Sequence, residues 1–176
     1  MVAVRGSHLL NPKDFEIEKW CANLNVAENV KANLMTAWHY SQQKMTLRAE
    51  HQQEKAHLLT FGVEMVEILN SLNMDADSLF TAMLFPIVRD QLVDLAQIEE
   101  DFGANISKLV RGVIEMDNIR QLNITHSASS LQVDNVRRML LAMVDDFRCV
   151  IIKLAERIAF LRDAEKNYTE EERVLA

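Results

Sequence analysis

The hydrophobic positions of this chain recur every three or four residues, which is the period of an α-helix with one buried face. Between residues 58 and 72 the apolar stripe is made of Leu58, Phe61, Met65, Ile68, Leu69 and Leu72. Stripes with the same spacing run over residues 79–87, 106–114, 136–143 and 150–161. The last of them consists of Val150, Ile151, Leu154, Ile158 and Leu161. We therefore predict a helix over each stretch, with its stripe facing the core.

Local signals predict where several of these helices begin and end. Asp75 and Asp77 precede the second stripe and are typical of a helix N-terminus. Gly103 is expected to close a short helix. Pro86 lacks a backbone N–H and clashes with the preceding turn, at a cost of about 3 kcal/mol. We therefore predict that the helix starting near Asp77 ends or kinks close to Phe85.

The remaining stretches are predicted to be two more helices and two loops. Residues 15–24 and 26–47 form the helices, and the polar stretches 51–55 and 123–130 form the loops. The expected core anchors of the two helices are Trp20, Leu34 and Trp38.

The composition agrees with a purely helical fold. The chain has only four glycines and two prolines, so it has little material for the turns of sheets. Its 176 residues are enough for one domain whose core needs no disulfide or metal for support. We predict an all-α fold, a single multi-helix bundle that covers residues 1–176.

Charge and cysteine content exclude several classes of partner. A net charge of −7 and a pI near 5.2 argue against direct binding of nucleic acid, which needs a basic surface. No stretch reaches the roughly 18 apolar residues of a membrane span, so no membrane partner is expected. Cys21 and Cys149 are too few for a disulfide framework, which favours a reducing compartment. We predict a cytoplasmic protein.

Common catalytic and metal-binding motifs are missing. The four glycines are never closer than nine residues apart, so no phosphate-binding loop is present. None of the five histidines has another histidine four residues away, and none is followed by Asp. A helical histidine pair for a metal is therefore not available.

Two remaining candidates have simpler interpretations. Cys149 lies in an apolar helix stripe, where a buried inert thiol is favoured over a nucleophile paired with histidine. Asp145 and Asp146 are adjacent and point about 100° apart on a helix, so they do not share a face. Ion pairs with Arg148 and Arg138 are the favoured interpretation.

One stretch has a specific resemblance. Residues 142–157 read AMVDDFRCVIIKLAER, and the pattern extends over residues 132–162. This segment resembles the one that closes the N-terminal hydrolase domain of the RelA/SpoT stringent-response family, and residues 1–5, 61–84 and 102–113 resemble it too. The resemblance implies an HD-type helical domain, followed in long members by a synthetase domain and regulatory domains. Residues 168–176 open like a helix and then stop, so we expect the chain to be truncated before the synthetase domain.

The same resemblance implies that the hydrolase site is degenerate. In active members a His, a His-Asp dipeptide and an Asp hold a manganese ion that activates water against the 3′ pyrophosphate. The corresponding positions here are Phe61, Phe85, Pro86 and Glu156. A Glu-Asp pair of active members corresponds to Arg89 and Asp90, and an Asn corresponds to Phe160. Ring side chains offer a divalent metal no lone pair, so we expect no metal, no cofactor and no catalytic residue in this chain.

By resemblance, the full chain belongs to the branch of the family that only synthesises alarmones. Such an enzyme transfers pyrophosphate from ATP to GTP or GDP, with Mg²⁺, and makes pppGpp and ppGpp. The implied partners are the synthetase domain of the same chain and, through regions absent here, the ribosome and uncharged tRNA. For the domain itself we favour a regulatory role. The alternatives are a residual (p)ppGpp 3′-pyrophosphohydrolase with an altered metal site, or a domain that still binds nucleotide without hydrolysing it.

Overall fold

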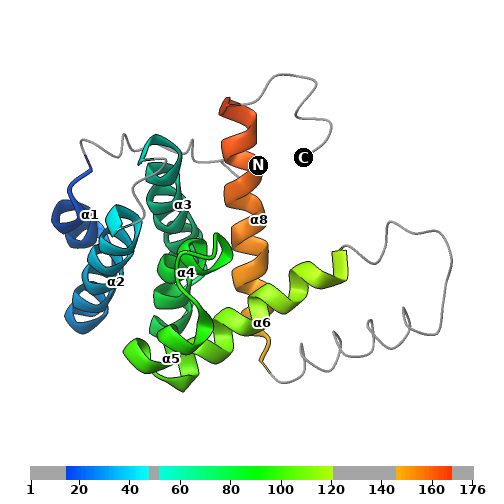
Figure 1. Cartoon of the computed structure of the whole chain (residues 1–176). Coiled ribbons are helices and arrows are strands. Elements are labelled where there is room, and N and C mark those ends of the chain that lie inside the picture. Colours follow the sequence, from blue (N-terminus) through cyan, green and yellow to red (C-terminus); the bar gives the residue numbers. More distant parts are fainter. Residues whose placement is uncertain (1–14, 48–51, 121–145, 168–176) are drawn as a thin grey trace, which may run out of the picture.

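The computed structural model describes residues 15–47, 52–120 and 146–167 of the chain. Over these residues the chain forms seven helices and no strand, which confirms the predicted all-α fold (Figure 1). The helices are α1 (Ile17–Asn23), α2 (Glu28–Leu47), α3 (Gln52–Ser71), α4 (Ala76–Arg89), α5 (Leu95–Phe102), α6 (Ala104–Arg120) and α8 (Arg148–Asn167). None of the helices in these ranges is long and apolar enough to cross a membrane.

Helix α4 is the centre of the bundle. It packs against α2, α3, α6 and α8, and its side chains from Thr81 to Val88 are all buried. A helix that is apolar on every side is stable only where other elements surround it. Its start agrees with the prediction, because the Asp75 carboxylate accepts a hydrogen bond from the Ser78 backbone N–H at 2.8 Å.

Of the two effects predicted for Pro86, an end of α4 close to Phe85 is wrong, and a kink there stays a prediction. The helix continues through Pro86 to Arg89 instead of ending near Phe85. Because the proline lies in the last turn, only one helical hydrogen bond is lost, and the Asp90 N–H still donates to the Pro86 carbonyl at 3.1 Å. Phe85 and Ile87 are fully buried beside it, and this burial offsets the cost of the proline.

The predicted loop at residues 51–55 is also wrong for residues 52–55, because α3 begins at Gln52. Gln, Glu and Lys are good helix formers, so a polar stretch alone does not indicate a loop. The predicted loop at 123–130 and the apolar stripe at 136–143 lie outside the described residues.

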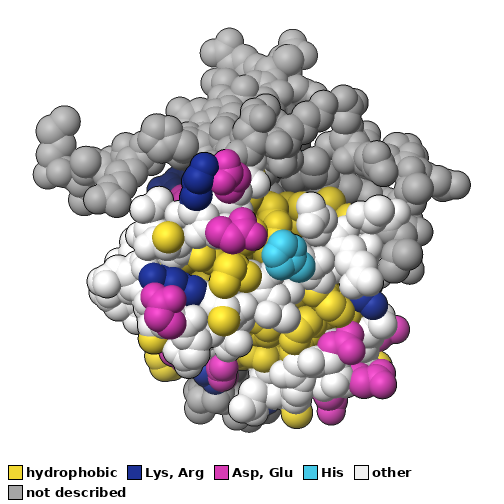
Figure 2. Space-filling model, turned by 90° about the vertical axis from the view of Figure 1, so that its left-hand side faces the viewer, with side chains coloured by type: hydrophobic (Ala, Val, Ile, Leu, Met, Phe, Trp, Pro, Cys, Tyr) yellow, Lys and Arg dark blue, Asp and Glu magenta, His cyan; other side chains and the backbone are white. Residues whose placement is uncertain are grey.

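The N-terminal helices follow the prediction more closely. Leu34 and Trp38 of α2 are buried, and Trp20 of α1 is partly buried with its indole N–H donating to Glu67 of α3 at 2.8 Å. On the face of the molecule where α1 and α2 lie, apolar side chains alternate with scattered acidic and basic ones (Figure 2). Gly103 ends α5 with a φ of +88°, as its predicted role as a helix stop requires.

The inner face of α8 differs from the predicted one. Cys149, Ile152, Ala155 and Ala159 are buried against the bundle, whereas Leu154, Ile158 and Leu161 of the predicted stripe are exposed. The helix packs on α3, α6 and α4 and lies on the side of the bundle opposite α1 and α2 (Figure 1). Because α8 carries apolar residues on both faces, periodicity could not indicate which face is inside. Leu72, at the end of the stripe in residues 58–72, is exposed as well.

Candidate functional site

Three helices bring the predicted site residues together. Phe61 comes from α3, Phe85 to Arg89 come from α4, and Glu156 comes from α8. The Arg89 Nη1 atom lies 3.0 Å from Glu156 Oε1, and the Arg89 guanidinium lies 5.0 Å from the centroid of the Phe61 ring. Residues far apart in the sequence therefore meet at one junction of α3, α4 and α8.

Two buried aromatic rings line this junction. Phe61 and Phe85 are almost completely removed from solvent. The Phe61 ring has two neighbours, the Arg89 guanidinium and the His57 ring, whose centroid is 6.0 Å away. Lys153 Nζ lies 5.9 Å from the centroid of Phe85. The rings contribute burial and cation–π contacts, and they offer a metal ion no ligand atom.

Glu156 keeps a carboxylate, but both of its oxygens have partners. Its side chain is only 8% exposed, Arg89 pairs with Oε1 at 3.0 Å, and Lys153 Nζ pairs with Oε2 at 2.8 Å. A buried carboxylate without a cation would cost several kcal/mol. An arginine and a lysine of the chain therefore supply the positive charge that this buried carboxylate needs.

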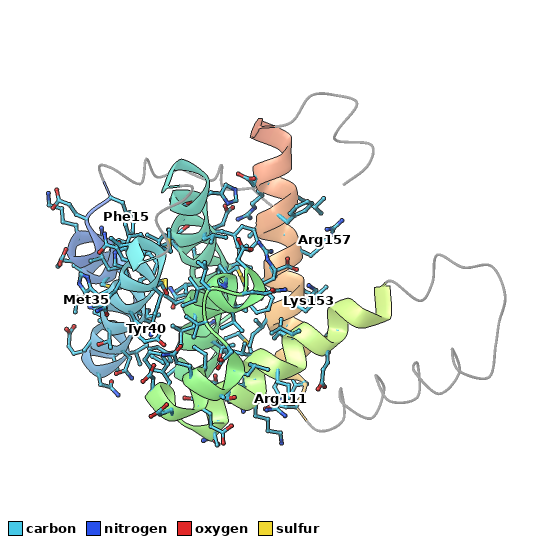
Figure 3. The ribbon with its side chains drawn as sticks, viewed as in Figure 1. Phe15, Met35, Tyr40, Arg111, Lys153 and Arg157 are labelled. Atoms are coloured by element: carbon cyan, nitrogen blue, oxygen red, sulfur yellow. The ribbon has the colours of Figure 1, made fainter. Side chains whose placement is uncertain are left out.

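The other two predicted positions lie at the edge of the junction. Asp90 is the exposed C-cap of α4, and its Oδ1 lies 3.8 Å from Arg89 Nε. Phe160 is partly buried on α8, with the Arg157 guanidinium 4.8 Å from its ring centroid. Lys153 and Arg157 both lie on the side of the bundle away from α1 and α2 (Figure 3). Asp90 therefore contacts Arg89 of the junction, and Phe160 follows Glu156 by four residues on α8.

Two further contacts between polar side chains, one with a histidine and one an ion pair, tie α8 to α3, and sequence reasoning missed both. His57 Nε2 lies 2.8 Å from Asp163 Oδ2, and Arg162 Nη1 lies 3.4 Å from Glu64 Oε1. The residues of the second pair are 98 positions apart, so no local pattern could pair them. One feature of the sequence could have indicated such pairs. Glu156 and Asp163 are seven residues apart, so both carboxylates lie on the same side of α8, which is the inner side.

A second arginine links the starts of α4 and α8. Arg148 donates to both carboxylate oxygens of Asp146 and to Asp75 Oδ2 at 2.9 Å. This confirms the predicted pairing of Asp146 with Arg148, whereas Asp145 and Arg138 lie outside the described residues. Asp77 is farther away, 3.9 Å from Arg148 Nη1.

These contacts shift the pKa values of Asp75, Asp146 and Arg148. Hydrogen bonds from Arg148 hold the pKa of Asp146 below its usual value. Burial by itself raises the pKa of Asp75, but hydrogen bonds from Ser78 and Arg148 outweigh it and lower the pKa overall. The hydrogen bond to Asp146 is the main reason that the pKa of Arg148 is raised.

Cys149 is buried, as predicted. Its thiol lies 3.8 Å from the Leu109 carbonyl oxygen of α6, and burial raises the pKa of the thiol. Gly112 makes this contact possible, because a Cβ at that position would lie 2.5 Å from the Cys149 Sγ. A buried thiol with a raised pKa is a poor nucleophile.

The residues of the junction do not fit a metal ion. Phe61, Phe85 and Pro86 have no ligand atom in their side chains, and Glu156 is already paired with two cations. Within residues 15–47, 52–120 and 146–167 there is no group of three or more His, Cys, Asp or Glu side chains that could hold a metal ion.

Comparisons with known proteins agree with this architecture. The model of the HD domain family matches residues 37–176. The chain is 63% identical to a GTP pyrophosphokinase of Haemophilus influenzae and 49% identical to one of Escherichia coli K12, over all of its length in both cases. It spans about a quarter of the length of these curated relatives, 24% and 23%.

A further relative has a different name. The chain is 33% identical over 104 residues to a guanosine-3′,5′-bis(diphosphate) 3′-pyrophosphohydrolase of Haemophilus influenzae. That match covers 59% of this chain and 15% of the relative. Together with the family match and the helical bundle, these similarities confirm the resemblance found in the sequence. The chain belongs to the HD domain family, and its similarity to GTP pyrophosphokinases over its whole length agrees with the N-terminal HD domain of the RelA/SpoT family.

Proposed function

We propose that this chain is a regulatory domain of a GTP pyrophosphokinase of the RelA/SpoT type and does not hydrolyse alarmones itself. The observation that carries this proposal is the pairing of Glu156 with Arg89 and Lys153. The one carboxylate that remains at the former metal position is neutralised by side chains of the same chain. Water activation by a bound ion therefore has no ligand set from which to start.

The function of the whole protein is part of the same proposal. Relatives named GTP pyrophosphokinase support a pyrophosphokinase activity for the longer protein. By the family resemblance, we expect this to be transfer of pyrophosphate from ATP to GTP or GDP, with Mg²⁺, at a synthetase domain outside this chain. The products would be pppGpp and ppGpp of the stringent response. The expected partners are that synthetase domain and, through other regions, the ribosome and uncharged tRNA. The expected location is the cytoplasm.

A regulatory role needs differential contacts with two states of a partner, and it needs no chemistry in the domain itself. The contacts of α8 suit this role. Arg89 of α4 and Glu64 of α3 hold α8 through ion pairs, and His57 of α3 contacts Asp163 of α8. Because these charges belong to the chain, the arrangement of the three helices does not depend on the supply of a metal ion.

A residual (p)ppGpp 3′-pyrophosphohydrolase is the second candidate, because one relative carries that name at 33% identity. The test is to incubate the purified chain with ppGpp and Mn²⁺ and to measure the release of pyrophosphate. The related pyrophosphohydrolase of Haemophilus influenzae, assayed in parallel, is the positive control. We expect release at the level of a mock preparation.

Two measurements complete the test. Thermal unfolding with Mn²⁺ alone should leave the melting temperature unchanged, because Glu156 is occupied by cations of the chain. Unfolding with ppGpp alone tests a retained nucleotide site, since a ligand at 100 times its Kd stabilises a protein by about 2.7 kcal/mol. Release of pyrophosphate above the mock level would overturn the proposal.

A further inference from the structure

The solvent-facing side of α2 carries no charge over most of its length. Residues 32–43 read ANLMTAWHYSQQ, and none of them is Asp, Glu, Lys or Arg. In the whole chain 26% of the residues are charged. The face of a helix that meets water normally carries charged residues, so this face of α2 differs from an ordinary solvated one.

The exposed residues of α2 form one row along the helix. They recur at intervals of three and four residues, which places them on one side. We call this row the α2 seam, and it consists of Asn29, Ala32, Thr36, His39, Gln43 and Thr46, all of them exposed. Helix α2 lies on the side of the bundle away from α8 (Figure 1). The seam is therefore separate from the junction of α3, α4 and α8.

The polar groups of the seam can be buried without loss of hydrogen bonds. The Thr36 hydroxyl donates to the Ala32 carbonyl oxygen at 2.9 Å, and the Thr46 hydroxyl donates to the Gln42 carbonyl oxygen at 2.8 Å. Burial of these hydroxyls against a partner leaves no donor without an acceptor. The side-chain amides of Asn29 and Gln43 carry both donors and acceptors, so they can pair with groups of the same kind.

The charge of the chain indicates which partner suits the seam. At a net charge of −7, two copies of the chain repel each other at most orientations. A contact through the α2 seam brings no like charges together, and a surface of amides is complementary to a copy of itself. Charged residues are depleted at the centre of protein interfaces in general. A second copy of the chain therefore suits the seam better than a partner selected by its charge.

The order of small and large residues along the seam selects an antiparallel arrangement. A two-fold axis between residues 37 and 38 pairs Asn29 with Thr46, Ala32 with Gln43, and Thr36 with His39. Ala32 and Thr36 then each meet a larger side chain, which is how facing helices fill the space between them. In a parallel pair each residue would meet its own copy, so Ala32 would leave a gap and His39 would be crowded.

We propose that the α2 seam is a self-complementary interface through which two copies of this chain form an antiparallel dimer with two-fold symmetry. Such an interface uses the same surface patch of both subunits. One helix against its copy is a small contact, so the dimer is weak and forms reversibly. The dimer goes beyond the proposed function and does not depend on it, because no residue of the seam belongs to the junction that contains Glu156.

The first test is disulfide formation between single-cysteine variants in the purified chain. Asn29→Cys is mixed with Thr46→Cys under mild oxidation, and mass spectrometry identifies the linked peptides. We expect a 29–46 link between two copies, because the antiparallel register brings these positions together. The native Cys21 and Cys149 are buried. The matched control mixes Asn29→Cys with Ala32→Cys, which lie at opposite ends of the antiparallel pair and should not link.

The outcomes of this test separate the possible arrangements. A link between two copies of Asn29→Cys would indicate a parallel pair and would overturn the proposal. Absence of the 29–46 link would overturn it as well. The same mixture is oxidised in the longer polypeptide, where loss of the link would show that another segment covers the seam and would also overturn the proposal.

The second test places charges at positions 32 and 43, which face each other across the proposed axis. Ala32→Glu/Gln43→Lys should retain the dimer in sedimentation equilibrium, because each Glu meets a Lys of the other copy. Ala32→Glu/Gln43→Glu should raise the Kd of the dimer at least about tenfold through repulsion of like charges. Ala32→Lys/Gln43→Lys should do the same although it reduces the net charge of the chain. Equal Kd values for the three variants would contradict the register.

Salt provides a further check on the same samples. Raising the ionic strength screens the repulsion between two acidic chains and leaves the uncharged seam unaffected. The dimer of the parent chain should therefore become tighter in salt. A dimer that dissociates in salt would depend on ion pairs and not on the seam, and a chain that stays monomeric at every concentration and salt would overturn the proposal.

Discussion

Two arginines tie α4 to α8 at opposite ends of α4, and they do so in different surroundings. Arg89, at the end of α4, pairs with Glu156, whose side chain is 8% exposed. Arg148, at the start of α8, pairs with Asp146 and with Asp75, whose side chain is about half exposed. An arginine–carboxylate ion pair therefore has a different effect on stability in each place. A buried carboxylate depends on its cation to remain charged, whereas a carboxylate near the surface can turn to water instead.

The two arginine clusters also differ in their place in the fold. The Arg148 side chain joins two aspartates that accept backbone N–H groups at the starts of α4 and α8, an arrangement that any helical bundle could use. The Arg89 contacts occupy the positions at which the family resemblance places a metal. The buried cluster is therefore the one on which the proposed function rests.

The largest effect is expected from Arg89→Ala. The change leaves buried Glu156 with Lys153 as its remaining cation, and we expect a loss of roughly 2–3 kcal/mol in the free energy of unfolding. For a domain of this size each kcal/mol lowers the melting temperature by about 2–4 °C. Calorimetry of the purified chain measures the loss.

The control for this prediction is the double variant Arg89→Ala/Glu156→Gln. Removing the buried charge together with its cation should recover part of the stability lost in the single variant. An Arg89→Ala protein as stable as the parent would show that Glu156 does not depend on Arg89.

A smaller effect is expected from Arg148→Ala. The aspartates that lose this partner are nearer to solvent, so we expect a loss of about 1–2 kcal/mol. Urea unfolding of this variant beside Arg89→Ala tests the ranking directly. A larger loss in the free energy of unfolding for Arg148→Ala than for Arg89→Ala would contradict this ranking.

The contacts of Arg148 with Asp75 and Asp146 predict how the stability of the folded chain depends on pH. The pKa values of Asp75 and Asp146 are lowered in the folded chain, so the unfolded chain binds more protons in this range. Their contribution is complete above the ordinary pKa of 3.8 and is lost as the pH falls through the lowered values. Melting temperatures measured from pH 5 downward should fall less steeply in Arg148→Ala than in the parent. Parallel curves for the two proteins would contradict this assignment.

The smallest expected effect is the change of these stability differences with salt concentration. Raising the ionic strength toward 1 M shortens the Debye length to about 3 Å, which screens charges near solvent more than buried ones. The stability difference between the parent and Arg148→Ala should therefore shrink in salt, while the difference for Arg89→Ala should persist. Thermal melts of the three proteins at low and high NaCl provide the measurement, and an equal response of both differences would contradict it.

Much of the local structure was predictable from the sequence. The spacing of apolar residues indicated the helices, Asp75 indicated the start of α4, and Gly103 indicated the end of α5. These features depend on hydrogen bonds and side chains within a few residues of one another. The residue types at Phe61 and Phe85 likewise showed that imidazole and carboxylate ligands are missing there, because ligand chemistry is a property of the side chain itself.

Other features were decided by packing between helices. The partner of Glu156 lies 67 residues earlier in the chain, and no local pattern pairs the two. Pro86 continues a helix because neighbouring helices bury its turn, and Leu154 faces solvent because the other apolar face of α8 fits the bundle. Amino-acid order determined the helical periods and the side-chain chemistry, since both are local. Only the tertiary structure decided which apolar face is inside and which cation meets which carboxylate, because those depend on contacts between segments distant in the chain.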